Sequence, residues 1–127
     1  MAKEIIFPEQ YAALNLPLSA GVKSGDLLFV SGQLALDKKG NLAGKGDVKK
    51  QTEQALRNVE EILLGGGSSL EKVLKVTVYL ADISQFSAMN EVYRTFFRDK
   101  FPARTTVQVK LSRDEYLIEI DAVASCS

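Results

Sequence analysis

The sequence predicts a single α+β domain over residues 1–127, in which two helices cover one face of a β-sheet. Short segments with alternating apolar and polar residues, typical of strands, occur at both ends and in the middle of the chain. Two intervening segments repeat apolar residues at intervals of three and four, as amphipathic helices do. A chain of 127 residues is also too short to divide into two well-buried cores.

The first elements are short strands. Residues 4–7 (Glu-Ile-Ile-Phe) are a candidate strand that Pro8 ends, and residues 17–22 are a second candidate. A turn signal at residues 23–26 precedes the apolar run 27–30, so we expect a β-hairpin. Residues 37–40 indicate a further turn or loop.

The first helix is expected to begin after Asp47, a suitable N-cap, and to end at the three glycines 65–67, which tolerate positive φ. Its apolar face comprises Val48, Thr52, Ala55, Val59, Ile62 and Leu63. The glycines are a weak signal for phosphate binding, because they follow a helix instead of leading from a strand into one.

A central strand at residues 73–80 and a second helix come next. The helix is expected to start near Ser84 or Ser87, and Pro102 closes it off. One side of the helix carries an aromatic stripe that we interpret as core: Phe86, Met89, Tyr93, Phe96 and Phe97.

Two strands, residues 104–111 and 116–124, finish the chain and are joined by the polar residues 112–115. If their apolar residues pack under the helices, the polar ones share the other face of the sheet: Arg104, Thr106, Glu119 and Asp121. That face is either solvated or covered by another subunit. In the second case, Arg104 and Glu119 would become binding and acid–base groups.

Composition excludes several functions. Sixteen basic residues balance sixteen acidic ones, so no net field favours nucleic acid or a membrane surface. No apolar run could span a membrane and no signal peptide is recognisable, so a cytoplasmic protein is expected. The single cysteine, Cys126, lies next to the end of the sequence and can form no disulfide within it.

The absence of histidine narrows the chemistry further. It removes Ser-His-Asp and Cys-His catalysis and any imidazole-bound metal, and we expect neither a metal nor another cofactor. A Schiff base on Lys75 or Lys110 is a remaining option, but no pattern indicates a desolvated lysine.

Five segments, in order, resemble the signatures of the RidA/YjgF family: residues 30–33 (VSGQ), 76–82 (VTVYLAD), 90–93 (NEVY), 101–104 (FPAR) and 118–124 (IEIDAVA). The resemblance implies a chorismate-mutase-like fold with a mixed sheet, and a homotrimer with active sites in clefts between subunits. It also implies a hydrolase that converts reactive 2-imino or enamine acids to 2-keto acids and ammonia.

The resemblance also implies roles for single residues. Arg104 matches the family's carboxylate-binding arginine, and Glu119 matches the acid that positions and activates water. Gly32 and Asn90 match residues that line the pocket, and Thr106 stands where members often carry a small residue or cysteine.

These residue types suit that reaction. A planar guanidinium donates two parallel hydrogen bonds to a carboxylate, and this fixes the neighbouring C=N carbon. Glu119 would then hold the attacking water and transfer its proton, a contribution of roughly 10²–10⁴-fold.

Leu18 departs from the family pattern, which commonly has tyrosine or another aromatic residue there, closing over the substrate. Leucine keeps apolar contact but lacks the hydroxyl donor. Three alternatives therefore stay open: a deaminase of a larger imine or enamine, a non-catalytic trimeric ligand-binding or chaperone-like protein using the same clefts, and RNA cleavage. The zero net charge and the missing histidine argue against RNA.

Overall fold

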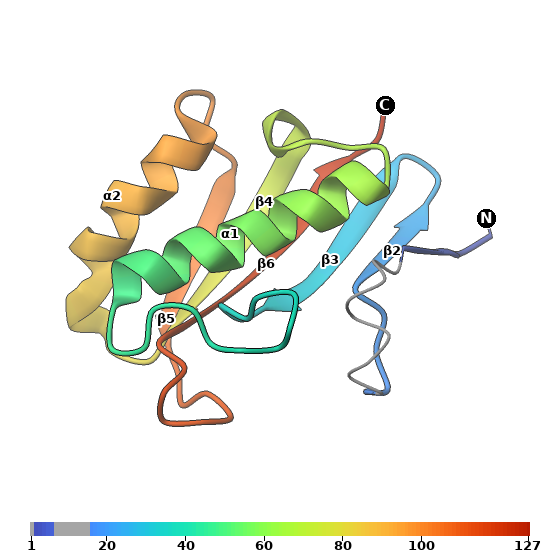
Figure 1. The fold of residues 1–127 in the computed structure, drawn as a ribbon. Helices are drawn as coiled ribbons and strands as arrows, with labels where there is room; N and C mark the ends of the chain where they lie inside the picture. Colours follow the sequence, from blue (N-terminus) through green and yellow to red (C-terminus); the bar gives the residue numbers. More distant parts are fainter. Residues whose placement is uncertain (1, 7–15) are drawn as a thin grey trace.

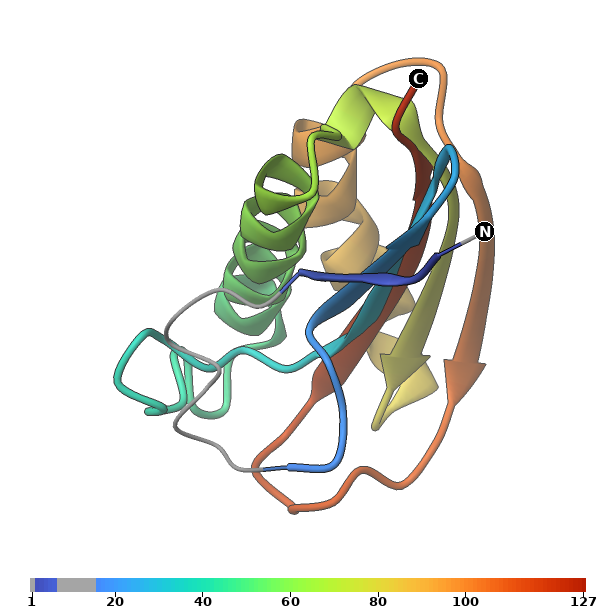
Figure 2. The ribbon, with the colours of Figure 1, turned by 90° about the vertical axis from the view of Figure 1, so that its right-hand side faces the viewer.

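The computed structural model describes residues 2–6 and 16–127, which form a six-stranded mixed sheet with both α-helices on one face (Figures 1 and 2). The strands are β1 (Glu4–Ile6), β2 (Gly21–Ser24), β3 (Leu27–Gln33), β4 (Val73–Leu80), β5 (Ala103–Gln108) and β6 (Ile118–Ser125). Their order is β1-β2-β3-β6-β4-β5, and only the pair β4 and β5 is parallel. The expected α+β class is confirmed, as is the hairpin formed by β2 and β3.

The helices are α1 (Val48–Gly65), η2 (Leu70–Lys72), η3 (Ile83–Gln85) and α2 (Phe86–Phe97), where η denotes a short 3₁₀ helix. The Asp47 carboxylate caps α1 by accepting hydrogen bonds from the backbone N–H groups of Lys49 and Lys50, as expected. Helix α2 ends well before Pro102, because the chain turns at Arg98 with a φ of 58°.

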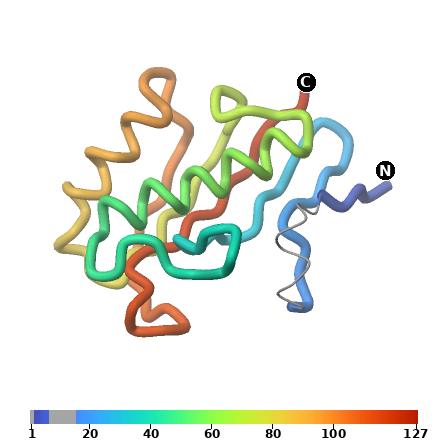
Figure 3. The backbone as a smooth tube through the Cα atoms, in the orientation of Figure 1, coloured from blue at the N-terminus to red at the C-terminus, as the bar shows by residue number. Residues whose placement is uncertain are grey.

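The hydrophobic core lies between the helices and the sheet. Helix α1 runs across the strands and α2 lies beside it, as the tube in Figure 3 shows. The largest fully buried apolar side chains come from both layers: Leu28, Leu56, Val59, Ile62, Leu63, Val76, Val78, Leu80, Met89, Ile118 and Ile120. Each such side chain contributes about 1.5–3 kcal/mol relative to an exposed one.

A buried glutamine ties α1 to the segment that leads into β6. The Gln51 side-chain amide donates to the carbonyl oxygens of Gly44 and Glu115, both at 3.1 Å. Its side-chain oxygen accepts from the backbone N–H of Leu117 at 2.9 Å. These bonds fix the chain just before Glu119.

The last two strands are not neighbours, because β4 lies between them. Parallel pairing sets Val76 of β4 beside Arg104 of β5, and Val78 beside Thr106. Val76 and Val78 belong to the core under the helices, and residues paired in register point to the same face. The prediction that Arg104 and Thr106 lie on the uncovered face is therefore wrong.

Glu119 and Asp121 do lie on the uncovered face, as predicted. They pair in register with Tyr79 and Thr77 of β4, and the Tyr79 hydroxyl donates to the Asp121 carboxylate at 3.0 Å. An apolar row crosses the same face on β1, β2, β3 and β6: Ile5, Val22, Phe29 and Val123. Phe29 is 46% exposed and Ile5 44%, so this face presents apolar area that no part of the described chain covers.

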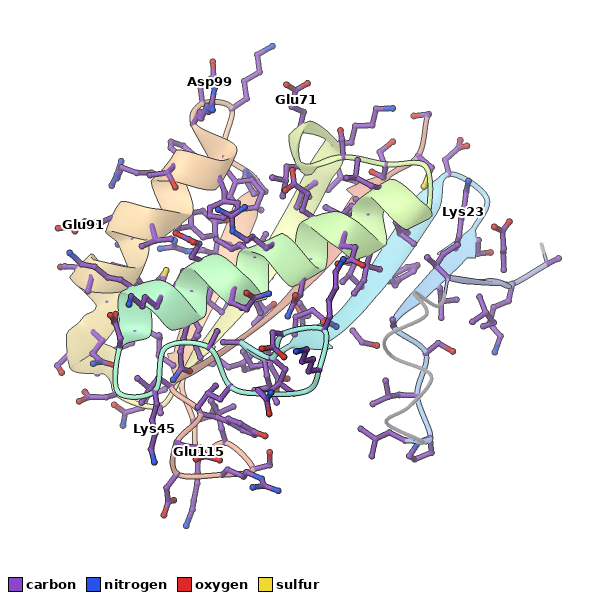
Figure 4. All side chains as sticks on the ribbon, viewed as in Figure 1. Lys23, Lys45, Glu71, Glu91, Asp99 and Glu115 are labelled. Atoms are coloured by element: carbon purple, nitrogen blue, oxygen red, sulfur yellow. The ribbon has the colours of Figure 1, made fainter. Side chains whose placement is uncertain are left out.

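Charged side chains lie mainly at the periphery. In Figure 4, Lys45, Glu71, Glu91 and Asp99 extend away from the sheet and the core. Glu91 of α2 forms an ion pair with Lys49 of α1 at 2.6 Å, which joins the two helices on their outer side. None of the helices in the described part of the chain is long and apolar enough to cross a membrane.

Candidate active site in two halves

The first half of the candidate site surrounds Arg104, under α2. Its guanidinium carbon lies 4.6 Å from the centroid of the Tyr93 ring and 5.4 Å from that of Phe86. One guanidinium nitrogen, Nη1, lies 3.9 Å from the sulfur of Met89. Residues 86, 89 and 93 are spaced to share one face of a helix. Helix α2 therefore contacts the guanidinium with one continuous stripe of side chains.

Arg104 forms no ion pair with any residue of 2–6 or 16–127. Rings that stack on the face of a guanidinium leave the N–H donors in its plane available. A cavity of about 350 Å³ opens beside it and is lined by Asn90, Tyr93, Arg94, Phe101, Pro102 and Arg104. A partly buried cation that has no carboxylate partner among the described residues, next to a small cavity, is suited to bind an anion.

Two buried hydroxyl groups lie on this side of the sheet. Tyr93 is 4% exposed, and neither its hydroxyl oxygen nor that of Thr106 has a hydrogen-bond partner within residues 2–6 and 16–127. Burial raises the pKa of Tyr93 to about 12, although the nearby Arg104 charge acts in the opposite direction. Tyr93 is thus a neutral phenol at physiological pH. Thr106 lies on the same face of β5 as Arg104 but does not line the cavity.

The second half of the site joins Gly32 and Glu119 on the uncovered face. The pairing of β3 with β6 shifts register between Val30 and Gln33, and Gly32 lies in this irregular stretch. A Cβ atom at position 32 would lie 2.8 Å from the Glu119 carboxyl carbon and still closer to one of its oxygens. A residue with a Cβ atom at position 32 would therefore displace the carboxylate from its present position.

Burial raises the pKa of Glu119 above its ordinary value, and the negative charge of Asp121 raises it further. Both effects disfavour the ionised carboxylate. A carboxyl group shifted in this direction can accept a proton and return it nearer to neutral pH, as general acid–base catalysis requires.

Leu18 belongs to a segment that is hydrogen-bonded to β3 next to Gly32, in the second half of the site. The backbone N–H of Ser31 donates to the Ala20 carbonyl at 2.9 Å, and the Ser31 hydroxyl donates to the Ser19 carbonyl at 2.6 Å. These bonds tie the segment that carries Leu18 to the residue next to Gly32. The Leu18 side chain is 52% exposed, so it is available for contact with a ligand or a neighbouring molecule.

The predicted site residues thus form two groups. Asn90 lines the cavity of Arg104, and Gly32 contacts Glu119. Arg104 and Glu119 project from opposite faces of the sheet, so one chain does not bring them together. Figure 2 shows these two faces: one is covered by the helices and the other is open.

The aromatic stripe that the sequence assigned to the core has a second role. Met89, Tyr93 and Phe97 are buried, but Phe86 is 39% exposed and lies against the guanidinium. The spacing of residues 86, 89 and 93 was the available signal. It could not reveal that their common neighbour is a cation from a strand, because that contact depends on the placement of β5.

The fold and the two half-sites define a small α+β protein with an exposed sheet face, a carboxylate of raised pKa and, under a helix, an arginine that forms no ion pair within residues 2–6 and 16–127. Within the described residues, no cluster of three or more His, Cys, Asp or Glu side chains could hold a metal ion.

The chain belongs to the endoribonuclease L-PSP family, which is the YjgF/RidA family, and the match extends over residues 10–126. A RutC family protein of Pyrococcus horikoshii is 45% identical over 96% of this chain and 97% of its own length. A protein of Capra hircus named 2-iminobutanoate/2-iminopropanoate deaminase is 37% identical over 98% of this chain and 90% of its own. The crystal structure of Escherichia coli TdcF with bound serine superposes with a TM-score of 0.82 at 34% identity, covering 88% of this chain and 90% of that one. The resemblance seen in the sequence motifs is confirmed.

Proposed function

We propose that this protein hydrolyses 2-imino and enamine acids to 2-keto acids and ammonia. The observation that carries the proposal is the state of Arg104, a partly buried guanidinium beside a small cavity, with no carboxylate partner among residues 2–6 and 16–127. A 2-imino acid supplies the missing carboxylate and places an electrophilic carbon next to it. A cavity of about 350 Å³ suits a substrate with few carbon atoms.

In the proposed mechanism, Arg104 binds the substrate carboxylate by donating two N–H hydrogen bonds to it. Glu119 accepts a proton as water adds to the C=N carbon, and a carbon–oxygen bond forms. Glu119 returns this proton to nitrogen, which gives a carbinolamine. It then removes the proton of the new hydroxyl group and passes it to nitrogen as the carbon–nitrogen bond breaks, so that the carbonyl forms and ammonia leaves. An enamine enters the same path once its carbon is protonated to give the imine. Such acid–base assistance is worth roughly 10²–10⁴-fold, which suffices to outpace spontaneous imine hydrolysis.

A neighbouring protomer completes this site in our proposal. Because Arg104 and Glu119 lie on opposite faces of one sheet, each catalytic pair needs residues from two chains. We propose a homotrimer of chorismate-mutase-like subunits, with the uncovered sheet faces inward and the sites in the clefts between protomers. The apolar row of Ile5, Val22, Phe29 and Val123 supports burial of this face.

The relatives support the proposed substrate class. One carries a deaminase name, and the E. coli TdcF structure contains serine, which is also a small carboxylate. We propose further that the protein acts in the cytoplasm without metal or cofactor. Dialysis against a chelator should then leave its activity unchanged.

The test is a coupled assay in which a dehydratase forms 2-aminoacrylate from serine, or its butanoate analogue from threonine. Added protein should accelerate the release of the keto acid, and Arg104→Ala protein should not. If wild-type protein gives no acceleration beside a working deaminase, the proposed reaction is wrong. Retained binding of a keto acid in that case would instead favour a non-catalytic binding protein, and RNA cleavage by the purified chain would favour the activity in the family's description.

The side chain of Leu18 favours a test with larger substrates. An amino-acid oxidase generates imines from alanine, leucine and phenylalanine in turn, and their hydrolysis rates can be compared. A preference for the larger imines would indicate that Leu18 contacts the side chain of the substrate. A preference for the smallest would indicate that Leu18 does not widen the site.

A further inference from the structure

Arg104 is a long side chain on the edge strand β5. Flexible side chains lose rotamer freedom when they bind a ligand, and this weakens binding unless they are held beforehand. An acidic neighbour would hold the guanidinium, but it would also occupy the N–H donors that a ligand carboxylate needs. Arg104 has no such neighbour within residues 2–6 and 16–127.

Helix α2 provides a different restraint. The Tyr93 ring lies closest to the guanidinium, at 4.6 Å from its central carbon, and Phe86 lies at 5.4 Å. Tyr93 is itself fixed, since it is 4% exposed and its ring packs on Phe97 with a centroid distance of 4.6 Å. A rigid ring beneath the guanidinium carbon restrains the group without occupying its N–H donors as a carboxylate would.

We infer that Tyr93 is a positioning residue: its ring holds the Arg104 guanidinium, before the ligand arrives, in the plane that presents the N–H donors to the cavity. Phe86 and Met89 complete the contact from the same face of α2. The inference rests on the proposed role of Arg104 as carboxylate anchor. It extends the site to Tyr93, whose place in the aromatic stripe indicated only core packing.

The ring carries this role and the hydroxyl does not. The Tyr93 hydroxyl is buried and makes no hydrogen bond of good geometry among the described residues, and its weaker interaction with Arg104 acts only to lower the pKa of Tyr93. Tyr93→Phe retains the aromatic face under Arg104, whereas Tyr93→Leu removes it. Phe96→Leu is a matched control, because Phe96 is a partly buried aromatic residue of the same helix and lies over Arg57.

The experiment is calorimetric titration of each protein with 2-oxobutanoate, a stable keto-acid product. Tyr93→Leu should weaken binding by roughly 3- to 30-fold, the range expected for one cation–π contact. Tyr93→Phe should restore binding to within about 2-fold of wild type, and Phe96→Leu should bind within the same range. Equal affinities for Tyr93→Leu and Phe96→Leu would overturn the inference, because a purely structural residue would behave in this way.

A second readout reports on the guanidinium directly. In NMR spectra of the ligand-free protein, the Arg104 Nε–H proton should be shifted upfield by the aromatic ring at position 93 in wild type, Tyr93→Phe and Phe96→Leu. In Tyr93→Leu it should return toward the position of an unstacked arginine. An unshifted signal in wild type would contradict the inference.

The inference and the proposed function can fail separately. A wild-type protein that binds 2-oxobutanoate but accelerates no imine hydrolysis would overturn the proposed reaction, and the titrations would still test Tyr93. A wild-type protein that hydrolyses imines, with Tyr93→Leu unchanged in KM and in keto-acid affinity, would overturn only the inference. If wild-type protein binds no keto acid at all, both are wrong.

Discussion

The carboxylate of Glu119 occupies the space that a Cβ atom at position 32 would need, so Gly32 and Glu119 are in direct contact across two strands. The contact arises where the pairing of β3 with β6 shifts register. It places the backbone of Gly32 against the group that we propose activates water. A side chain at position 32 would therefore displace the carboxylate before it disturbed anything else.

Gly32→Ala should lower kcat/KM by roughly 100-fold, because a displaced Glu119 loses its acid–base contribution. The thermal midpoint should change little, since Gly32 is exposed and the carboxylate can move toward solvent. Gly65→Ala is the control: the nearest atom to its new Cβ would be Ile6 Cγ2 at an ordinary 3.4 Å. Steady-state kinetics and calorimetry of both variants provide the check, and an active Gly32→Ala enzyme would contradict the assigned role of Glu119.

Glu119→Gln should be more thermostable than wild type at neutral pH. The folded pKa of Glu119 is raised above the ordinary value of 4.5, so the folded state holds the proton more tightly than the unfolded state does. The resulting stability is fully present below the ordinary pKa and is lost as pH rises through the folded pKa. Glutamine does not titrate. The gain in Tm over wild type should therefore be smallest near pH 4 and should grow toward pH 7, as the Glu119 carboxyl of wild type loses its proton. Calorimetry of both proteins across this range provides the test, and a gain in Tm that does not grow with pH would contradict the prediction.

Arg104→Lys should raise KM by roughly 10- to 100-fold, although it keeps the charge, because lysine cannot make the paired hydrogen bonds or the flat stacking contact. The matched control is Arg57→Lys. Arg57 also lies over an aromatic ring, that of Phe96 at 5.9 Å, and pairs with Glu53. Parallel kinetic measurements should show a normal KM for this control. Equal KM values for Arg104→Lys and wild type would exclude a bidentate anchor.

Mixed assemblies of two inactive variants should regain activity. If each site takes Arg104 from one protomer and Glu119 from its neighbour, a random mixture of Arg104→Ala and Glu119→Gln chains has about one quarter of its sites intact. Co-refolding equal amounts and measuring the rate against wild type provides the test. No recovery, with trimers shown to have mixed, would mean that both groups act from one chain.

Gln51→Leu should destabilise the fold by about 3 kcal/mol, because three partly buried backbone groups lose their partner, at about 1 kcal/mol each: those of Gly44, Glu115 and Leu117. Gln54→Leu loses only a side-chain bond to Asn58 and should cost about 1 kcal/mol. Urea unfolding with a constant m-value would measure both. Similar losses for the two variants would show that Gln51 does not connect α1 to the β6 entry as described.

Much of the fold was predictable because its signals are local. Asp47 and the glycines after residue 64 mark the ends of α1, and the apolar residues of β4 and β6 alternate as half-covered strands must. The order of strands is not a local property. Residues 112–115 connect β5 and β6 in the sequence, yet β4 lies between these two strands in the sheet. No short sequence pattern indicates that position of β4.

The prediction of which β5 side chains face the helices was wrong for a related reason. Alternation separates the two faces of a strand but does not say which one meets the helices. Val107 appeared to be core because it is apolar, yet it is 36% exposed on the uncovered face. Arg104 appeared to be surface because it is charged, yet the aromatic stripe of α2 covers it. The rule that apolar residues face the core and charged residues face solvent fails here, because the uncovered face is itself partly apolar and the helix side contains a cavity.

The two half-sites are carried by different parts of the sheet, and this separation has an evolutionary consequence. If the proposed function holds, mutations near position 18 can change which hydrocarbon group is accommodated, while β5 and α2 keep the binding site for the carboxylate that every 2-imino acid shares. Relatives could thus diverge in substrate range through a few changes before β2, without rebuilding the anchor.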